Sequence, residues 1–202
     1  SHLVGHYAPV EFGSDYAAIV SHVSDACAKG YYHGAEAQMV TEGLGYQERL
    51  HELCVEQQKT YDLPCFHGAG HAFLNETIDV QRSLDLCDDI KKYTEERFYK
   101  YIPDCYEAVF SEVTNLAGGY DGETGRSYEG DPVMTIDGSP IEYCAQFDER
   151  FHRPCALELS GLRIGTDSTY EEAGAAMQDC VTNAPTRLLT ESCLYNISSS
   201  YT

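Results

Sequence analysis

The residues of this chain best suited to chemistry are histidines that recur behind two cysteines. The pattern C-x-x-G-x-x-H spans residues 27–33 and returns at residues 65–71, ending at His33 and at His71. A third stretch, aligned on its cysteine, carries the carboxylate of Glu112 one place beyond the histidine position. Equivalent positions of successive helical repeats face the same side of a stack. We therefore expect His33, His71 and Glu112 to project into one groove.

The spacing of His67 and His71 points to a metal ion as the ligand of this groove. Residues four apart lie on one face of a helix, and two imidazoles at that spacing can bind a single ion. The predicted metal ligands are His33, His67, His71 and Glu112. We expect Glu36 and Glu107 to be additional ligands or to orient the ligands. Such a donor set suits zinc, iron, manganese or copper, and it leaves coordination positions open for hydrolytic or redox chemistry.

Two other interpretations of these histidines stay open. They can be core or helix-terminal residues bonded to backbone carbonyls, and Gly30 and Gly68 then serve only to let helices approach closely. In the second interpretation the site is metal-free, with His33 or His71 as a general base shielded by the 117–140 loop. No pairing of a nucleophilic serine or cysteine with a histidine stands out, so the sequence assigns no catalytic residue.

Nine cysteines divide the chain into similar units. Five of them recur at intervals of 38 to 50 residues, and the other four interleave with these. The first set is Cys27, Cys65, Cys105, Cys155 and Cys193, and the second set is Cys54, Cys87, Cys144 and Cys180. The lack of any C-x-x-C pair argues against zinc ribbons, thioredoxin-type motifs and covalent haem, and we expect neither a haem nor a nucleotide cofactor. Evenly distributed cysteines are typical of structural disulfides in an oxidising compartment.

Apolar residues at helical spacing around these cysteines predict an all-α fold of disulfide-stapled helical hairpins, a short α-solenoid. We expect one repeat domain over residues 1–202. Its units span about 15–58, 62–92, 102–150 and 153–183, followed by a partial fifth unit at 185–202. A long Gly/Asp-rich loop is inserted in the third unit at residues 117–140. Loops of this length are uncommon in compact domains and are often functional.

Local signals also predict where several helices begin. A proline precedes Cys65, Cys105 and Cys155 by one or two residues. Proline is tolerated in the first turn of a helix, so each of these cysteines is expected at a helix start. Ser168 and Glu171 match a capping box and predict the beginning of a later helix.

The hairpin geometry favours one disulfide within each unit. In an antiparallel pair, the N-terminal end of the first helix lies beside the C-terminal end of the second. The predicted pairs are Cys27–Cys54, Cys65–Cys87, Cys105–Cys144 and Cys155–Cys180. Pairing between adjacent units is the alternative, because connectivity does not follow from spacing alone. Cys193 is left unpaired or available for an intermolecular bond, which would make a homo-oligomer.

The charge of the chain excludes two classes of partner. Acidic residues outnumber basic residues by 33 to 13, which gives a formal net charge of −20 at pH 7. Such a surface repels nucleic acid and anionic membranes. No apolar run reaches the roughly 18 residues of a membrane span, so we expect no membrane insertion. The disulfides predict an extracellular or periplasmic location, and the sequons at Asn75 and Asn196 are candidate glycosylation sites.

The run C-F-H-G-A-G-H at residues 65–71, with Cys87 behind it, resembles a secreted cysteine-rich helical repeat family known mainly from hypothetical proteins. Its members carry C-x-H-G-x-G-H and then C-x-x-G-V-F-x-E-N. Here the second motif keeps its Val-Phe and its Glu, but Ala108 replaces the glycine and Val113 replaces the asparagine. The resemblance spans about residues 26–180 and implies an extracellular repeat protein without an assigned activity. The architecture is also similar to Sel1-like and TPR-like solenoids, as an analogy of fold only.

These observations favour a secreted binding module with a His/Glu transition-metal site between the first three repeat helices. The alternative is a structural or adhesive extracellular protein that assembles with itself or with another extracellular protein. A metal-dependent enzyme that uses the same site is a third hypothesis.

Overall fold

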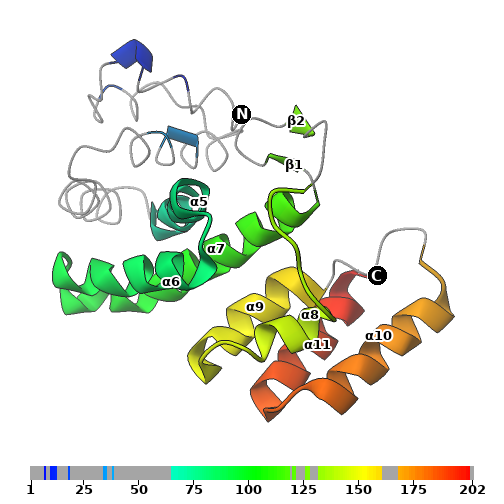
Figure 1. Ribbon diagram of the computed structural model, residues 1–202. Coiled ribbons are helices and arrows are strands. Elements are labelled where there is room, and N and C mark those ends of the chain that lie inside the picture. Colours follow the sequence, from blue (N-terminus) through cyan, green and yellow to red (C-terminus); the bar gives the residue numbers. More distant parts are fainter. Residues whose placement is uncertain are drawn as a thin grey trace. The chain divides into compact units, whose positions relative to one another are not determined.

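A computed structural model describes residues 65–118, 120–121, 126–127, 132–160 and 168–200, together with residues 7, 10–12, 18, 34–35 and 38. Helices dominate these residues, as the cysteine-centred pattern predicts (Figure 1). The chain divides into two compact units, Ser1–Asp131 and Pro132–Thr202. The single repeat domain expected over residues 1–202 stays a prediction, and each unit is described by itself.

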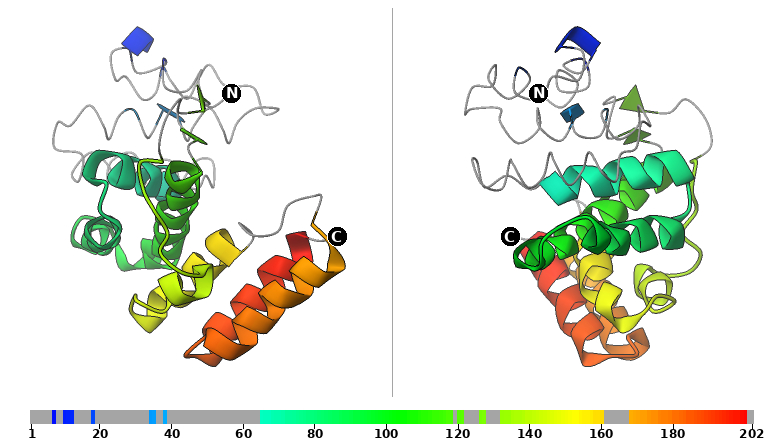
Figure 2. Two further views of the ribbon diagram at one scale, coloured as in Figure 1. Left: turned by 45° about the vertical axis from the view of Figure 1, so that its right-hand side comes forward. Right: turned by 90° about the vertical axis from the view of Figure 1, so that its left-hand side faces the viewer.

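The described part of the first unit is built around three α-helices that contact one another (Figures 1 and 2). They are α5 (Cys65–Thr77), α6 (Val80–Asp89) and α7 (Ile102–Ala117), with the 3-10 helices η2 (Ile90–Lys92) and η3 (Glu96–Tyr101) between α6 and α7. Large apolar side chains fill the space where they meet. These buried residues include Phe66, Phe73, Leu74, Leu84, Ile102, Phe110 and Leu116. The core therefore lies between α5, α6 and α7.

Local signals set the ends of these helices. Ile78 has a positive φ of 50°, which turns the chain sharply between α5 and α6. The Asp79 side chain then caps α6 by accepting a 3.0 Å hydrogen bond from the Arg82 backbone N–H. Pro103 lies in the first turn of α7, and Gly118 caps its C-terminus. These connections bring α6 and α7 back against α5.

The expected loop at residues 117–140 begins where α7 ends. Its described part contains a short antiparallel ladder of β1 (Tyr120–Asp121) and β2 (Arg126–Ser127). Tyr120 lies opposite Ser127 in this ladder. The next helix begins at Pro140, so the described residues of this segment form no α-helix before that point.

The second unit contains four further α-helices among its described residues. They are α8 (Pro140–Cys144), α9 (His152–Leu159), α10 (Tyr170–Asn183) and α11 (Arg187–Ser200), with the 3-10 helix η4 (Glu149–Phe151) before α9. Helix α11 packs against both α9 and α10, and α10 and α11 lie side by side (Figure 2). The buried apolar residues include Ile141, Phe151, Leu159, Leu189 and Ile197.

The predicted helix starts are confirmed at three cysteines. Cys65 opens α5, Cys105 lies in the first turn of α7, and Cys155 lies in the first turn of α9. The predicted capping box at Ser168 is wrong by one residue. The structure forms it between Thr169 and Glu172, whose side chain accepts from the Thr169 backbone N–H at 2.7 Å.

The described residues contain three disulfides, and each joins the second cysteine of one predicted unit to the first cysteine of the next. They are Cys87–Cys105, Cys144–Cys155 and Cys180–Cys193. This is the adjacent-unit pairing that spacing left open. The predicted pairs Cys65–Cys87, Cys105–Cys144 and Cys155–Cys180 are wrong. The assignment of Cys193 as unpaired or intermolecular is wrong as well, because its sulfur is bonded to Cys180.

The physical reason for this pairing is the shortness of the connections between helices. The bonded cysteines are separated by 11 to 18 residues, and their Cα atoms are 5.6–5.9 Å apart. A short connection brings the end of one helix beside the beginning of the next, within reach of a disulfide. Cys27, Cys54 and the side chain of Cys65 lie outside the described residues, so the predicted Cys27–Cys54 pair stays a prediction.

No helix in the described part of the chain is both long enough and apolar enough to cross a membrane.

Candidate functional site

The candidate site lies beside a close approach of α5 to α7 at Gly70. A Cβ atom built on Gly70 would lie 2.7 Å from the Cβ of Ala108 and would collide with the backbone carbonyl oxygen of Cys105. Position 70 therefore accepts only glycine without a shift of the backbone. Close helix approach was one interpretation of Gly68, which is buried; the contact itself is seen at Gly70.

His71 and Glu112 form a hydrogen bond across this close approach. The Nδ1 atom of His71 is 2.7 Å from Oε2 of Glu112. The Glu112 side chain is 1% exposed and that of His71 is 12% exposed. A carboxylate taken out of water needs hydrogen-bond donors or a positive partner, and the imidazole meets that need here. Two of the predicted site residues are thus brought into direct contact.

Asn115 adds a second donor to the same carboxylate oxygen. Its Nδ2 atom is 3.0 Å from Oε2 of Glu112. Asn115 follows Glu112 by three residues on α7, so both side chains lie on one face of that helix. The other oxygen, Oε1, is buried and makes no hydrogen bond within the described part of the chain. Both donors therefore gather on one oxygen and fix the orientation of the carboxylate.

His67 lies next to His71, one helical turn earlier on α5. The centroids of the two rings are 5.0 Å apart, and the ring planes meet at 67°. A metal ion bonded at about 2.05 Å to a ring nitrogen lies roughly 3.2 Å from the ring centroid. Two imidazoles on one tetrahedral ion then have centroids about 5 Å apart. The separation of His67 and His71 is therefore compatible with a shared metal ion, and it is also that of an ordinary edge-to-face pair of rings.

Of the other predicted members of the site, one lies within the described residues. His33 and Glu36 lie outside the described residues. Glu107 is half-buried on α7, and five residues of an α-helix rotate its direction by about 140° from that of Glu112. Within the described ranges, no three His, Cys, Asp or Glu side chains gather closely enough to hold a metal ion.

Two residues of the site were not anticipated from the sequence. Asn115 was not singled out, although its spacing of three from Glu112 on a predicted helix was a usable signal. Gly70 lies inside the histidine motif, but the glycine that recurs between the two repeats is Gly68. The role of Gly70 depends on Ala108 of another helix, and no local pattern contains that information.

His152 in the second unit shows what a purely structural histidine looks like in this chain. It is 4% exposed. Its Nδ1 is 3.0 Å from Thr186 Oγ1, and its Nε2 is 3.0 Å from the carbonyl oxygen of Phe147. A carbonyl only accepts hydrogen bonds, so Nε2 carries the proton and Nδ1 accepts from the Thr186 hydroxyl. Both ring nitrogens are thus engaged within the unit.

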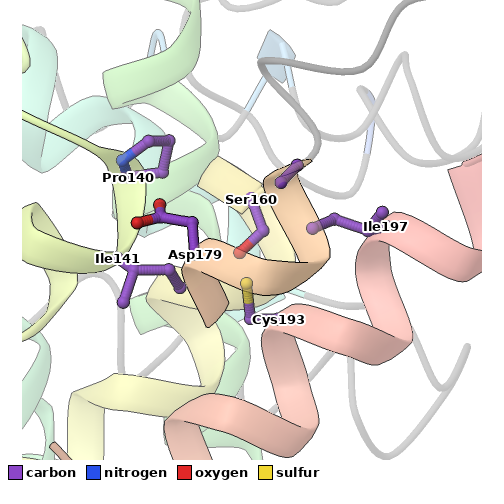
Figure 3. A pocket seen from close by; sticks show the side chains of 7 residues that line it. Pro140, Ile141, Ser160, Asp179, Cys193 and Ile197 are labelled. Atoms are coloured by element: carbon purple, nitrogen blue, oxygen red, sulfur yellow. The ribbon is translucent and has the colours of Figure 1, made fainter. Parts of the chain in front are cut away.

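The second unit also contains a small crevice with a mostly apolar lining (Figure 3). Its lining residues are Pro140, Ile141, Ser160, Ala176, Asp179, Cys193 and Ile197. Its volume is about 10 Å³, and one water molecule needs at least about 10–15 Å³. The crevice is therefore too small for an organic ligand.

Burial perturbs one carboxyl group on α7. It raises the pKa of Asp104, in the first turn of that helix, because the charged form loses contact with water. Asp104 is eight residues from Glu112 and is not part of the His71 contact. Its perturbation is consistent with a cost of burying charge rather than with catalysis.

The sequons are held by the fold in a way that disfavours glycan attachment. The Asn75 Nδ2 atom is buried. The Asn196 Nδ2 atom donates a hydrogen bond to the carbonyl oxygen of Leu157. A glycan is attached to this nitrogen, which is buried at Asn75 and hydrogen-bonded at Asn196 in the folded chain.

Comparison with family models, with curated proteins and with solved structures finds no match for this chain.

Proposed function

We propose that this chain is a binding module of an oxidising compartment that holds one transition-metal ion at His67 and His71. In this proposal the disulfide-stapled hairpins are repeats of a short α-solenoid. Helix α5, in the compact unit Ser1–Asp131, presents the metal site. Zinc and copper are the favoured ions, because imidazole nitrogen is a borderline ligand that suits both.

One observation carries the proposal. His67 and His71 are one helical turn apart with ring centroids 5.0 Å apart, which is the spacing of two imidazoles on one metal ion. The 2.7 Å contact between His71 Nδ1 and Glu112 supports it. Histidines that bind metals commonly donate the other ring N–H to a carboxylate, which orients the ring and makes it more basic.

The contact with Nδ1 gives Glu112 a different role from the one expected from the sequence. The carboxylate lies on the Nδ1 side of the ring, opposite the Nε2 atom. In the proposed site Glu112 therefore orients His71 and does not bind the ion itself. The protein supplies two imidazole nitrogens from α5, and water or an external ligand completes the coordination.

The disulfides support the proposed compartment. Three bonds within the described residues are typical of extracellular or periplasmic proteins, because cytosolic thiols are kept reduced. The charge of −20 is consistent with this proposal, since a negative surface raises the local concentration of metal cations.

The test is calorimetric titration of metal-free, disulfide-intact protein with Zn²⁺ and with Cu²⁺. We expect one ion per chain. His67→Ala and His71→Ala should each lower the affinity by more than about 100-fold, since loss of a ligand costs more than loss of an outer partner. His152→Gln is the matched control, because this residue lies in the other unit with both nitrogens engaged. Lack of stoichiometric binding, or full affinity in the double variant at residues 67 and 71, would refute the proposal.

A further inference from the structure

We infer that Asn115 is a positioning residue that makes Nε2 the metal-binding nitrogen of His71. The inference deepens the proposed function, on which its affinity measurement rests. The proton position that it assigns follows from the contacts of Glu112 alone. The inference adds Asn115 to the site and identifies Nε2 as the atom of His71 that faces the ion.

The first step concerns the orientation of the Asn115 amide. An ionised carboxylate only accepts hydrogen bonds, so a side chain 3.0 Å from Oε2 of Glu112 must present a donor. The amide therefore turns Nδ2 toward Oε2, because Oδ1 in the same place would set two acceptors against each other. Asn115 thus favours a negative charge on Glu112, because its bond is stronger to an ionised oxygen.

The second step concerns the proton between Glu112 and His71. It can lie on Nδ1 of His71, or it can lie on Oε2 of Glu112 with Nδ1 as the acceptor. A hydrogen bond to an ionised oxygen is about twice as strong as a bond to a neutral one. Asn115 donates to the same oxygen, so its bond is strongest when that oxygen is ionised. The proton therefore lies on Nδ1 of His71.

The third step follows from the chemistry of neutral imidazole, in which one nitrogen is protonated and the other carries the lone pair. With the proton on Nδ1, the lone pair of His71 is on Nε2. Metal ions bind the deprotonated nitrogen. Asn115 thus acts through Glu112 on His71, and it selects the nitrogen that points away from the buried carboxylate.

This arrangement of ligand atoms also determines which class of ion the site prefers. Two neutral imidazole nitrogens favour Cu²⁺, Ni²⁺ and Zn²⁺, whereas Ca²⁺ and Mg²⁺ require oxygen ligands. Glu112 has Oε2 engaged by His71 and Asn115 and Oε1 buried, so the carboxylate is not arranged to offer a hard oxygen ligand. We expect an excess of Ca²⁺ or Mg²⁺ to leave the Zn²⁺ affinity unchanged, because neither of these ions binds the site.

The decisive experiment is ¹⁵N NMR of the histidine rings in the full, metal-free, disulfide-intact chain at slightly alkaline pH. We expect His71 to show a protonated Nδ1. His152 is an internal reference of the opposite kind, because its Nε2 faces the carbonyl oxygen of Phe147. The same spectrum should therefore show a protonated Nε2 for His152. A protonated Nε2 on His71 would overturn the inference.

Two variants then test the role of Asn115. Asn115→Asp keeps the shape of the side chain and places an acceptor against Oε2, and Asn115→Ala removes the donor. We expect both to reduce the share of His71 with a protonated Nδ1 and to lower Zn²⁺ affinity by about 10- to 100-fold. If either variant melts at a lower temperature while His71 keeps the wild-type proton position and affinity, Asn115 is only structural and the inference is wrong.

The two proposals fail in different ways. Lack of Zn²⁺ binding by the wild-type chain would refute the proposed function, and the proton position would still be decided by the metal-free spectra. Zn²⁺ binding with an unshifted proton in both variants would leave the function standing and would refute the role of Asn115.

Discussion

Gly70 of α5 lies so close to Ala108 of α7 that a Cβ atom at position 70 would be 2.7 Å from the Cβ of Ala108. The carbonyl oxygen of Cys105 closes the same space from the backbone. The adjoining residue on α5 is His71, which meets Glu112 on α7. Helix packing and the candidate site are therefore set by one contact.

The first prediction concerns this contact. Gly70→Ala should lower the free energy of unfolding by about 1–3 kcal/mol, because an added methyl group forces a backbone shift between packed helices. It should also weaken Zn²⁺ binding, since the shift separates His71 from Glu112. Urea unfolding and metal titration measure the two effects.

Gly174 provides the control for this prediction. It lies within α10, and a Cβ atom there would meet nothing within 4 Å. Gly174→Ala should stabilise the chain by up to about 1 kcal/mol, because alanine is the better helix former. Equal effects at the two glycines would contradict the close approach of α5 and α7.

The second prediction concerns Cys193. Cys193→Ser removes the bond to Cys180, which spans 13 residues. The expected loss of stability is about 3 kcal/mol, as for other disulfides that close loops of this length. The measurement is thermal or urea unfolding of the two proteins, with peptide mapping to establish the wild-type bonds. A covalent dimer of the wild-type chain that disappears in Cys193→Ser would show that the pairing is wrong.

The third prediction concerns pH and Asp104. Burial raises the pKa of this carboxyl above its ordinary value of 3.8. The folded state therefore holds the proton more tightly than the unfolded chain, and stability from this group is lost as pH rises through the folded pKa. Asp104→Asn should raise the melting temperature at neutral pH, and the difference should vanish below the ordinary pKa. A difference in melting temperature that grows toward acid pH would mean that folding lowers the pKa of Asp104 instead of raising it.

The fourth prediction concerns glycosylation. Secreted from cells that attach N-glycans, the folded chain should carry none at Asn75 or Asn196, because both side-chain nitrogens are used or buried. Treatment with an N-glycosidase should leave its mass unchanged. Asn196→Gln should cost about 1 kcal/mol through its misplaced hydrogen bond to Leu157. A glycan found at either position on the native protein would contradict this geometry.

Helix beginnings could be predicted from the sequence because their causes are local. The prolines before Cys65, Cys105 and Cys155 restrict the first turn wherever the rest of the chain goes. The capping box shows the limit of such signals. Ser168 and Thr169 both have a glutamate three residues later, and only the backbone conformation at Thr169 decides between them.

Disulfide pairing could not be predicted in the same way. The cysteines mark the ends of helices, but their pairing depends on which two ends meet in space. The same applies to the candidate site. The likeness of the repeats suggested His71 and Glu112, yet the contact of Asn115 with Glu112 and that of Gly70 with Ala108 depend on how α5 crosses α7. Those distances are tertiary and have no counterpart in residue spacing.

The order of the disulfides has a consequence for the synthesis of the chain. Each of the three bonds joins a cysteine to the next cysteine along the sequence. During passage into an oxidising compartment, each of these pairs is complete before the following pair emerges. An oxidase that simply joins cysteines in their order of arrival would make these three bonds, provided that the odd one of the preceding cysteines, Cys27, Cys54 and Cys65, does not react with Cys87. This part of the chain can therefore mature from its N-terminal side toward its C-terminal side without an isomerase to reshuffle its bonds.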